Sequence, residues 1–320
     1  CQGCGMYDSR FVRRCKENGS EGNFKSDMIH GVVNVIKPTG MSSHDVIGQL
    51  RRIYNMKKIG HAGTLDPLAA GVLPVYLGQA TRLIEYGDSS VKTYHAEFVL
   101  GLATDTEDST GEVVAQAPVR AFRFDEIQQA VQSFHGEIGQ TPSRYSAINV
   151  NGVKAYKLAR QHTEFTLPVR HVTIHDIQLL SYNHGRGVIA VTCSKGTYIR
   201  SLIRDIGEAL GTYACMTYLV RVRAGLFDIA EAATLEEIEA NPVAYVQPAD
   251  MAIQELPKTV CNHKQCTFLL QGRPVPFAGK GVADKAVLRV YTLEKKLAGI
   301  ARFDKEHHVI RPHKMFADIG

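Results

Sequence analysis

Residues 60–74, GHAGTLDPLAAGVLP, place a single carboxylate, Asp66, in a glycine-bordered loop just before an apolar run. The segment matches neither GxxxxGK[ST] nor GxGxxG, the loop motifs that cradle phosphates, so it does not predict either kind of nucleotide site. A lone loop aspartate followed by proline is typical of a turn. Composition and spacing alone therefore assign Asp66 to a turn and give it no chemistry.

The residues before this loop predict a strand, a turn and a helix. Residues 31–40, GVVNVIKPTG, are a β-branched apolar run ended by Pro-Thr-Gly, as expected of a strand followed by a turn. Ser43 is a suitable N-cap for a helix with apolar residues at helical spacing: Val46, Ile47, Leu50 and Ile53. The letters SSHD at 42–45 include the residue types of a hydrolase triad, but triads are assembled from separated segments, so helix capping explains them better.

The residues after the loop predict a half-buried strand and an acidic turn. Residues 92–101, KTYHAEFVLG, alternate apolar and polar side chains and place Tyr94 on the buried side. Residues 104–114, TDTEDSTGEVV, lack the spacing of an EF-hand. They predict a solvated turn between two strands.

Further elements complete an α+β pattern. Residues 124–134 predict an amphipathic helix, residues 188–193 a strand, and the residues from Ile199 onward a helix in which Arg200 and Arg204 fall together off the apolar stripe. Thr234 and Glu237 form a capping-box pair at the start of another helix. From about residue 250, short apolar runs divided by Gly, Lys and Asp predict a small β-rich module. We therefore expect a larger mixed domain and a small C-terminal β domain.

Composition sets the class of protein. The chain has 320 residues, 44% hydrophobic residues and a formal net charge of +5, which permits a polyanionic partner without demonstrating one. No apolar run approaches the roughly 20 residues that cross a bilayer, so we expect no membrane association. Residues 1–27 are polar and lack apolar periodicity, and we expect a disordered N-terminal extension before a compact chain that begins near Met28.

The cysteines indicate thiols rather than a disulfide framework or a metal centre. Seven cysteines are scattered along the chain, which fits the reducing cytoplasm. Two groups have partial ligand spacing, Cys1, Cys4 and Cys15, and Cys261, His263 and Cys266. Neither group has the four ligands of a structural zinc site, so we expect no metal.

Six ordered blocks of the sequence resemble the TruB family of pseudouridine synthases. They are GVVNVIKPTGMSSHDVIGQLRR, KKIGHAGTLDPLAAGVLPVYLGQATRL, KTYHAEFVLGLATDTEDSTGEVV, QTPSRYSAINVNGVKAYKLAR, CSKGTYIRSLIRDIGEALG and YLVRVRAGLF. Ordered blocks are far more specific than any single motif. The resemblance covers roughly residues 28–316 and implies a mixed-sheet catalytic domain over residues 28–250. Residues 251–320 resemble the RNA-binding PUA module (pseudouridine synthase and archaeosine transglycosylase) of bacterial members.

The resemblance implies an isomerase that converts uridine 55, in the T loop of tRNA, to pseudouridine without metal or cofactor. The glycosidic bond from N1 breaks, the base turns while still held, and C5 bonds to C1′. A carboxylate is needed either as the nucleophile at C1′ or as the base that removes a 2′ proton to give a glycal, and the sequence leaves both routes open. No water is activated, so the two-carboxylate arrangement of glycoside hydrolysis is not required.

Three residues match the catalytic positions of the family. Asp66 matches the catalytic aspartate. Arg200 matches the arginine that pairs with this aspartate and keeps it ionised and aimed. Tyr94 matches the tyrosine that stacks on the target base and is a candidate to take the proton lost from C5, although a core tyrosine fits the strand pattern equally well.

Four residues match substrate-binding positions. Leu219 matches an apolar wall of the base pocket. The uridine must be pulled out of the stacked tRNA elbow, and His61 matches the histidine that takes its place in the T loop. Lys37 and Arg82 match basic or turn positions near the RNA path, where phosphate neutralisation makes binding salt-dependent. The chain departs from many relatives by having Asn149 and Arg82 where they have lysine and Cys215 where they have histidine, so a cation near the substrate is lost at Asn149.

Two other functions remain as alternatives. An RNA-binding protein that helps tRNA to fold by opening the elbow would use many of the same residues, and this activity is compatible with catalysis. A member of a guide-RNA particle is less favoured, because the short C-terminal module and the lack of basic extensions indicate a stand-alone bacterial-type enzyme. Family habit implies a monomer that needs tRNA and no obligatory protein partner.

Overall fold

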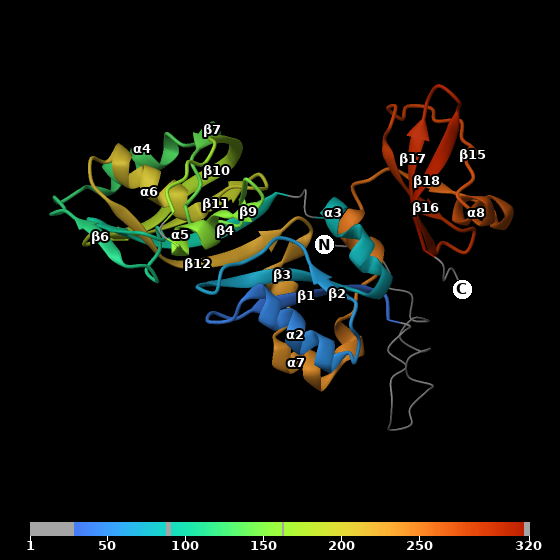
Figure 1. Ribbon diagram of the computed structural model, residues 1–320, viewed down its shortest axis with the longest axis horizontal. Coiled ribbons are helices and arrows are strands. Elements are labelled where there is room, and N and C mark those ends of the chain that lie inside the picture. The colour runs from blue at the N-terminus through green and yellow to red at the C-terminus, as the bar shows by residue number, and fades with distance from the viewer. Residues whose placement is uncertain (1–28, 88–90, 162, 317–320) are drawn as a thin grey trace, which may run out of the picture.

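The computed structural model describes residues 29–87, 91–161 and 163–316. The expected N-terminal extension lies outside these residues, as do Cys1, Cys4 and Cys15. Within them, the chain forms an elongated molecule with a larger mixed domain and a smaller β domain at one end (Figure 1). This arrangement confirms the predicted α+β fold class.

A nine-stranded sheet is the scaffold of the larger domain. Its main path has the strand order β1-β3-β12-β4-β11-β10-β7, with β2 beside β3 and β13 beside β12. The strands are β1 (Gly31–Lys37), β2 (Ile59–His61), β3 (Ala69–Leu77), β4 (Lys92–Leu100), β7 (Gly136–Gln140), β10 (Arg170–Asn183), β11 (Arg186–Cys193), β12 (Ala214–Ala224) and β13 (Phe227–Asp228). The strands predicted at 31–40, 92–101 and 188–193 are therefore confirmed.

One parallel seam joins the two halves of this sheet. Strand β3 pairs with β12 in parallel through Ala69, Ala70 and Gly71, whereas the other pairings in the sheet are antiparallel. Gly71 has φ +102°, and a Cβ there would lie 2.3 Å from the carbonyl oxygen of Arg221. Glycine is therefore required where the two backbones approach most closely.

Helices cover the two halves of the sheet separately. Helix α2 (Ser43–Ile53) and α7 (Leu235–Ala240) pack with the apolar residues of β1 and β3. Helices α4 (Phe124–Gln132) and α6 (Ile199–Ala209) pack on β4, β10, β11 and β12. Figure 1 shows α2 beside α7 below β1 and β3, and α4 with α6 at the other end of the sheet.

The predicted helix starts are confirmed with one shift. The Thr234–Glu237 capping box begins α7 as expected. At α2, however, the N-cap is Ser42 and not Ser43, and Ser42 and Asp45 form the capping box. Ser43 is instead the first helical residue, and its hydroxyl is directed into the protein, where only 2% of the residue is exposed.

Short elements connect the main strands. They are η2 (Gly78–Leu83), α3 (Ile84–Gly87), β5 (Leu102–Thr104), β6 (Val113–Gln116), β8 (Asn149–Val150), β9 (Val153–Lys154), α5 (Ala155–Arg160), η3 (Ile229–Glu231), η4 (Pro242–Tyr245) and η5 (Ala249–Ile253). Strands β5 and β6 form a hairpin, so the acidic residues predicted to form a turn do lie between two strands.

The C-terminal module has its own five-stranded sheet, in the order β14-β16-β17-β18-β15. It contains β14 (Lys258–Val260), α8 (His263–Leu270), β15 (Val275–Pro276), β16 (Val287–Tyr291), β17 (Leu297–Asp304) and β18 (Val309–Met315). Its own core lies between α8 and the sheet. Ile300 and Phe316 also join an apolar cluster with Val32 and Leu83 of the larger domain, so the two parts share buried surface.

No helix in the described ranges is long and apolar enough to cross a membrane.

Candidate active site

Asp66 lies in the loop that joins β2 to β3. Its carbonyl accepts a hydrogen bond from Ala69 N at 3.0 Å, which closes the turn expected of Asp-Pro. The side chain is 47% exposed. The sequence thus places the carboxylate at an accessible position, just before the parallel seam of the sheet.

Arg200 reaches Asp66 from the first turn of α6. Its Nη2 lies 2.9 Å from Asp66 Oδ2, and the arginine side chain is only 8% exposed. Arg200 Nη1 donates to the carbonyl of Thr106 at 2.8 Å and lies 3.5 Å from Asp108 Oδ2. The guanidinium therefore holds two carboxylates, one open to solvent and one buried, and a charge-assisted contact of this kind fixes both distance and direction.

The acidic turn that supplies Asp108 is not simply solvated. Asp108 is 4% exposed, and its Oδ1 accepts hydrogen bonds from Thr106 Oγ1 at 2.9 Å and from Thr110 N at 3.0 Å. The sequence prediction of a solvated turn is wrong at this residue because the buried cation of Arg200 compensates for desolvation of the carboxylate. Aspartates recur in solvated loops, so the local pattern contained no signal of this pairing.

Glu107, beside Asp108, ties the same turn to α6. Its carboxylate accepts from Ser201 Oγ at 2.7 Å and forms an ion pair with Arg204. Burial raises the pKa of Glu107, and the Arg204 guanidinium opposes this shift. Arg200 and Arg204 do share one side of the helix, as predicted, and that side is covered by the acidic turn rather than by water.

Tyr94 and Leu219 lie on adjacent strands, β4 and β12. In the register of this pair, Tyr94 is opposite Arg221 and Leu219 is opposite Ala96. Tyr94 is 8% exposed and Leu219 is 7% exposed. Both belong to the same buried apolar cluster as Leu65, the residue before Asp66. The cluster therefore brings the Asp66 loop and these two side chains into one region.

Lys37 is completely buried at the end of β1. Its Nζ donates to the carbonyls of Pro38 at 2.7 Å and Met41 at 2.6 Å. Burial lowers the pKa of Lys37 to about 8, and the nearby negative charge of Asp66 opposes this shift. The expectation that Lys37 lies along an RNA path differs from this position, because a phosphate contact requires an accessible ammonium.

Arg221 is a buried cation that the sequence analysis missed. Only 1% of the residue is exposed. Its Nε donates to the carbonyl of Val72 at 2.7 Å and its Nη2 to the carbonyl of Gly63 at 2.9 Å. Arg221 thus ties β12 to both β3 and the Asp66 loop. The only available signal was an arginine inside the apolar strand that contains Leu219.

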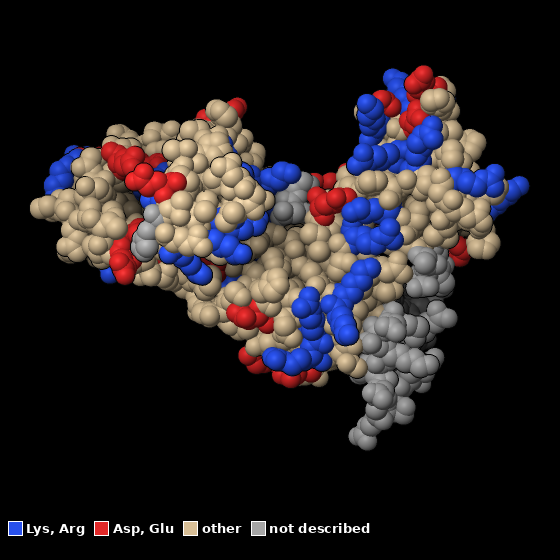
Figure 2. Space-filling view, in the orientation of Figure 1, with Lys and Arg blue, Asp and Glu red and all other residues tan. Residues whose placement is uncertain are grey.

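His61 and Arg82 lie farther along the same part of the chain. His61 is the half-buried last residue of β2 and pairs with Val75 of β3. Arg82, in η2, donates from Nη1 to the carbonyl of Met315 at 2.6 Å, and its own carbonyl accepts from Lys314 Nζ at 3.0 Å. The structure therefore places Arg82 at the junction with the C-terminal module. Figure 2 shows lysines and arginines gathered around this junction and over α2 and β2.

The two departures from the family pattern lie in different environments. Asn149 is exposed in β8. Cys215 is fully buried in β12, with Sγ 3.6 Å from Thr104 Oγ1, and burial raises the pKa of its thiol. Cys215 is thus part of the packing between β12 and the hairpin that presents the acidic turn.

In the described part of the chain, no three His, Cys, Asp or Glu side chains converge as a metal site requires. Cys261 and Cys266 are both buried in the C-terminal module, where Cys266 Sγ lies 3.6 Å from the carbonyl oxygen of Cys261.

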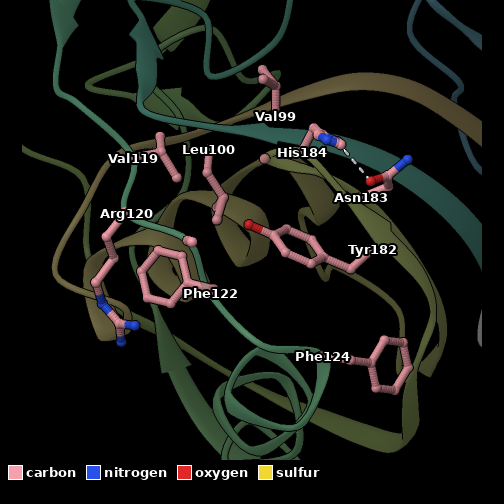
Figure 3. Close-up of a pocket in the computed structure, with 11 residues that line it drawn as sticks. Val99, Leu100, Val119, Arg120, Phe122, Phe124, Tyr182, Asn183 and His184 are labelled. Carbon is pink, nitrogen blue, oxygen red and sulfur yellow. Dashed lines mark hydrogen bonds between the residues drawn. The ribbon is translucent and has the colours of Figure 1, made fainter.

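A separate open pocket of about 480 Å³ lies at the far end of the sheet (Figure 3). It is lined by the end of β4, by residues 119–124 and by the turn between β10 and β11. Arg120 lies over the ring of Phe122 at 3.9 Å from the ring centroid, and His184 contacts Asn183. None of Asp66, Tyr94 and Arg200 lines it, so the largest hollow and the candidate chemistry do not coincide.

Comparisons of sequence agree across most of the chain. A family model described as "TruB family pseudouridylate synthase (N terminal domain)" matches residues 51–199. A second, described as "tRNA pseudouridylate synthase B C-terminal domain", matches residues 200–256. The chain is 41% identical to "tRNA pseudouridine synthase B" of Moorella thermoacetica over 307 residues, which cover 90% of this chain and 99% of that protein. It is 44% identical to the protein of the same name from Symbiobacterium thermophilum over 253 residues, 78% of this chain and 84% of that protein.

Solved structures show the same architecture. One titled "Structure of H/ACA RNP bound to a substrate RNA containing 2'-deoxyuridine" has a chain with a TM-score of 0.70 and 25% identity, covering 93% of this chain and 92% of that one. One titled "Crystal Structure of a Cbf5-Nop10-Gar1 Complex" has a chain with a TM-score of 0.70 and 26% identity, covering 89% of this chain and 84% of that one. Both sets of comparisons point to proteins that act on RNA.

Proposed function

The chain belongs to the TruB family of pseudouridylate synthases, and we propose that it isomerises uridine 55 in the T loop of tRNA, with Asp66 as its catalytic group. Its relatives are named tRNA pseudouridine synthases, and the chain is accordingly a tRNA pseudouridine synthase, an isomerase. The observation that supports Asp66 is its ion pair with Arg200 at 2.9 Å, next to the apolar cluster that contains Tyr94 and Leu219.

The reaction rearranges bonds without a net gain or loss of atoms. The N1–C1′ bond breaks, a C5–C1′ bond forms, C5 loses its proton and N1 gains one. Asp66 acts either by attacking C1′ or by removing the 2′ proton, and both actions need an ionised, accessible carboxylate. A side chain that is 47% exposed and held on one side by a guanidinium meets that requirement.

The neighbouring residues supply positioning and exclusion of water. Arg200 keeps Asp66 ionised and aimed. Tyr94 stacks on the extruded base and accepts the proton from C5, while Leu219 forms the apolar wall beside it. An apolar wall strengthens the electrostatic interactions inside the pocket because it excludes water.

The RNA contacts follow from the accessible residues. His61 occupies the place that the extruded base leaves in the T loop. Arg82 acts near the junction with the PUA-like C-terminal module, where the basic side chains of Figure 2 neutralise phosphates. For Lys37, burial supports a different part: its ammonium organises the turn after β1 and lies near Asp66. We further propose that the enzyme acts as a monomer.

Release of tritium from a tRNA transcript labelled at C5 of uridine tests this proposal. The wild-type protein releases tritium from the transcript and releases none when position 55 is a cytidine. Asp66→Asn binds the transcript but releases no tritium. Asp228→Asn is the matched control, because Asp228 caps η3 through a hydrogen bond from Ala230 N at 3.0 Å and has no part in the site. Full activity of Asp66→Asn overturns the catalytic assignment, and a single sedimenting species of dimer mass overturns the monomer.

A further inference from the structure

The backbone on both sides of Asp66 is held by a segment more than 20 residues earlier in the sequence. Ser43 Oγ donates to the carbonyl of Leu65 at 3.0 Å and accepts from the amide of the same residue at 2.9 Å. On the other side of Asp66, Gly40 N donates to the carbonyl of Pro67 at 2.8 Å. The residues that flank the carboxylate are therefore fixed by hydrogen bonds that do not involve the carboxylate itself.

A hydroxyl suits the contact with Leu65 because it can donate one hydrogen bond and accept others at the same time. Ser43 is 2% exposed and Leu65 is 3% exposed, so water does not replace either bond if the hydroxyl is lost. Buried backbone groups are almost always paired. Without the hydroxyl, the loop must shift until the amide and carbonyl of Leu65 find other partners.

The segment that holds the loop is itself rigid. Lys37 Nζ donates to the carbonyls of Pro38 and Met41. Ser42 and Asp45 form the capping box that starts α2, and Ser42 N donates to Asp45 Oδ2 at 2.8 Å. Ser43 therefore projects from the first turn of a helix whose start is fixed from two sides.

The carboxylate depends on this support more than a buried side chain would. Half of the Asp66 side chain is open to solvent, and the printed side-chain contact that orients it is the one with Arg200. Its aim at the nucleotide is thus set by that ion pair and by the backbone of residues 65–67. Displacement of reacting groups by about 1 Å can cost about 100-fold in rate.

We propose that Ser43 is a positioning residue for Asp66: its hydroxyl holds the backbone of Leu65 and so places the carboxylate against Arg200 and the substrate sugar. The inference rests on the proposed function, because it assumes that Asp66 is catalytic. Ser43 has no contact with the nucleotide. Its loss is therefore expected to lower kcat and to leave KM and tRNA affinity unchanged.

The test compares Ser43→Val with Ser43→Thr, which have nearly the same size and differ by one hydroxyl. Ser43→Ala, which adds no volume, is the second variant if the larger side chains prevent folding. Ser194→Val and Ser194→Thr are the matched control, because Ser194 Oγ accepts from Thr173 N at 2.9 Å in another part of the domain. Single-turnover rates, KM, thermal unfolding and tRNA binding are measured for each, with binding repeated in the Asp66→Asn background.

Ser43→Val and Ser43→Ala are expected to lose about 100-fold in kcat relative to Ser43→Thr, with KM unchanged, while the two Ser194 variants match one another. In the Asp66→Asn background, the Ser43 variants bind tRNA equally. Equal kcat for Ser43→Val, Ser43→Ala and Ser43→Thr overturns the inference, as does a loss confined to KM or an equal loss at Ser194. Activity of Asp66→Asn overturns the proposed function instead, whatever the Ser43 variants do.

Discussion

Asp66 and Arg200 form an ion pair in which the carboxylate side chain is 47% exposed and the guanidinium side chain only 8% exposed. The arginine is surrounded by protein and has a second carboxylate, Asp108, at 3.5 Å. The aspartate keeps its other side open. This asymmetry suits a catalytic acid that must meet a substrate while a fixed cation maintains its charge and direction.

Arg200→Lys is expected to lower the single-turnover rate by about 100-fold and to change tRNA affinity little. A lysine ammonium cannot match the planar fork that contacts Asp66, the carbonyl of Thr106 and Asp108 together. Rapid-quench measurement of product with excess enzyme checks the rate. The matched control is Arg186→Lys, at an exposed arginine that pairs with Glu97 at 3.3 Å, and an equal loss there would count against a specific role for Arg200.

Asp108→Asn is expected to reduce stability by about 2 kcal/mol and also to reduce activity. The asparagine keeps its size and can still accept the hydrogen bond from Thr110, but the buried guanidinium loses one of its two carboxylates. Urea unfolding measures the stability. Glu112→Gln, on an exposed residue of the same turn, is expected to behave like the wild type. A fully stable and active Asp108→Asn variant would show that Asp66 alone is enough to hold Arg200.

Lys37 predicts a pH dependence of stability. Burial lowers its pKa from 10.5 to about 8, so between these pH values the unfolded chain binds more protons than the folded one. The free energy of unfolding contributed by Lys37 therefore rises as the pH rises from about 8 towards 10.5. Measured at pH 7 and pH 10, the stability of the wild type relative to Lys37→Met should increase, whereas the same comparison with Lys58→Met, at an exposed position, should stay flat.

The same titration reports on the proximity of Asp66. The negative charge of Asp66 raises the pKa of Lys37, against the effect of burial. In the Asp66→Asn background, the pKa of Lys37 should fall further, and the rise in stability should begin at a lower pH. An unchanged pH window in that background would mean that the two side chains do not interact.

Arg82→Ala is expected to loosen the C-terminal module. It removes the hydrogen bond from Arg82 to the carbonyl of Met315, worth about 1 kcal/mol. Amides of β18 should then exchange faster, with little change in β10 and β11 of the larger domain. Arg82→Lys retains a cation that can donate to the same carbonyl and should restore slow exchange; equal protection in all three proteins would exclude a part for Arg82 in holding the module.

The sequence predicts the elements of this fold better than their arrangement. The strand that contains Tyr94 and the helix that follows Ser42 were predictable because hydrophobic periodicity and capping are local. The N-cap was displaced by one residue because Ser42 and Ser43 are equally good caps by type, and only the burial of the Ser43 hydroxyl distinguishes them. The position of β12 between β3 and β4 has no local signal.

The site was predicted in the same uneven way. Asp66, Arg200, Tyr94 and Leu219 were named through the family resemblance, and their catalytic parts stay predictions. The burial of Asp108, Lys37 and Arg221 was not foreseen, because charged side chains enter a core only when distant partners compensate for desolvation. Those partners lie on other strands and turns, so a reading of neighbouring residues does not reveal them.

The parallel seam between β3 and β12 also sets a clock for the appearance of function. Asp66 precedes β3 and Arg200 precedes β12, and three residue pairs in parallel register join these strands. Contacts between segments so distant in sequence form slowly, because chain closure opposes them until both surfaces are ready. In a refolding experiment, enzymatic activity should therefore lag behind secondary structure and mark the moment at which the two half-sheets dock.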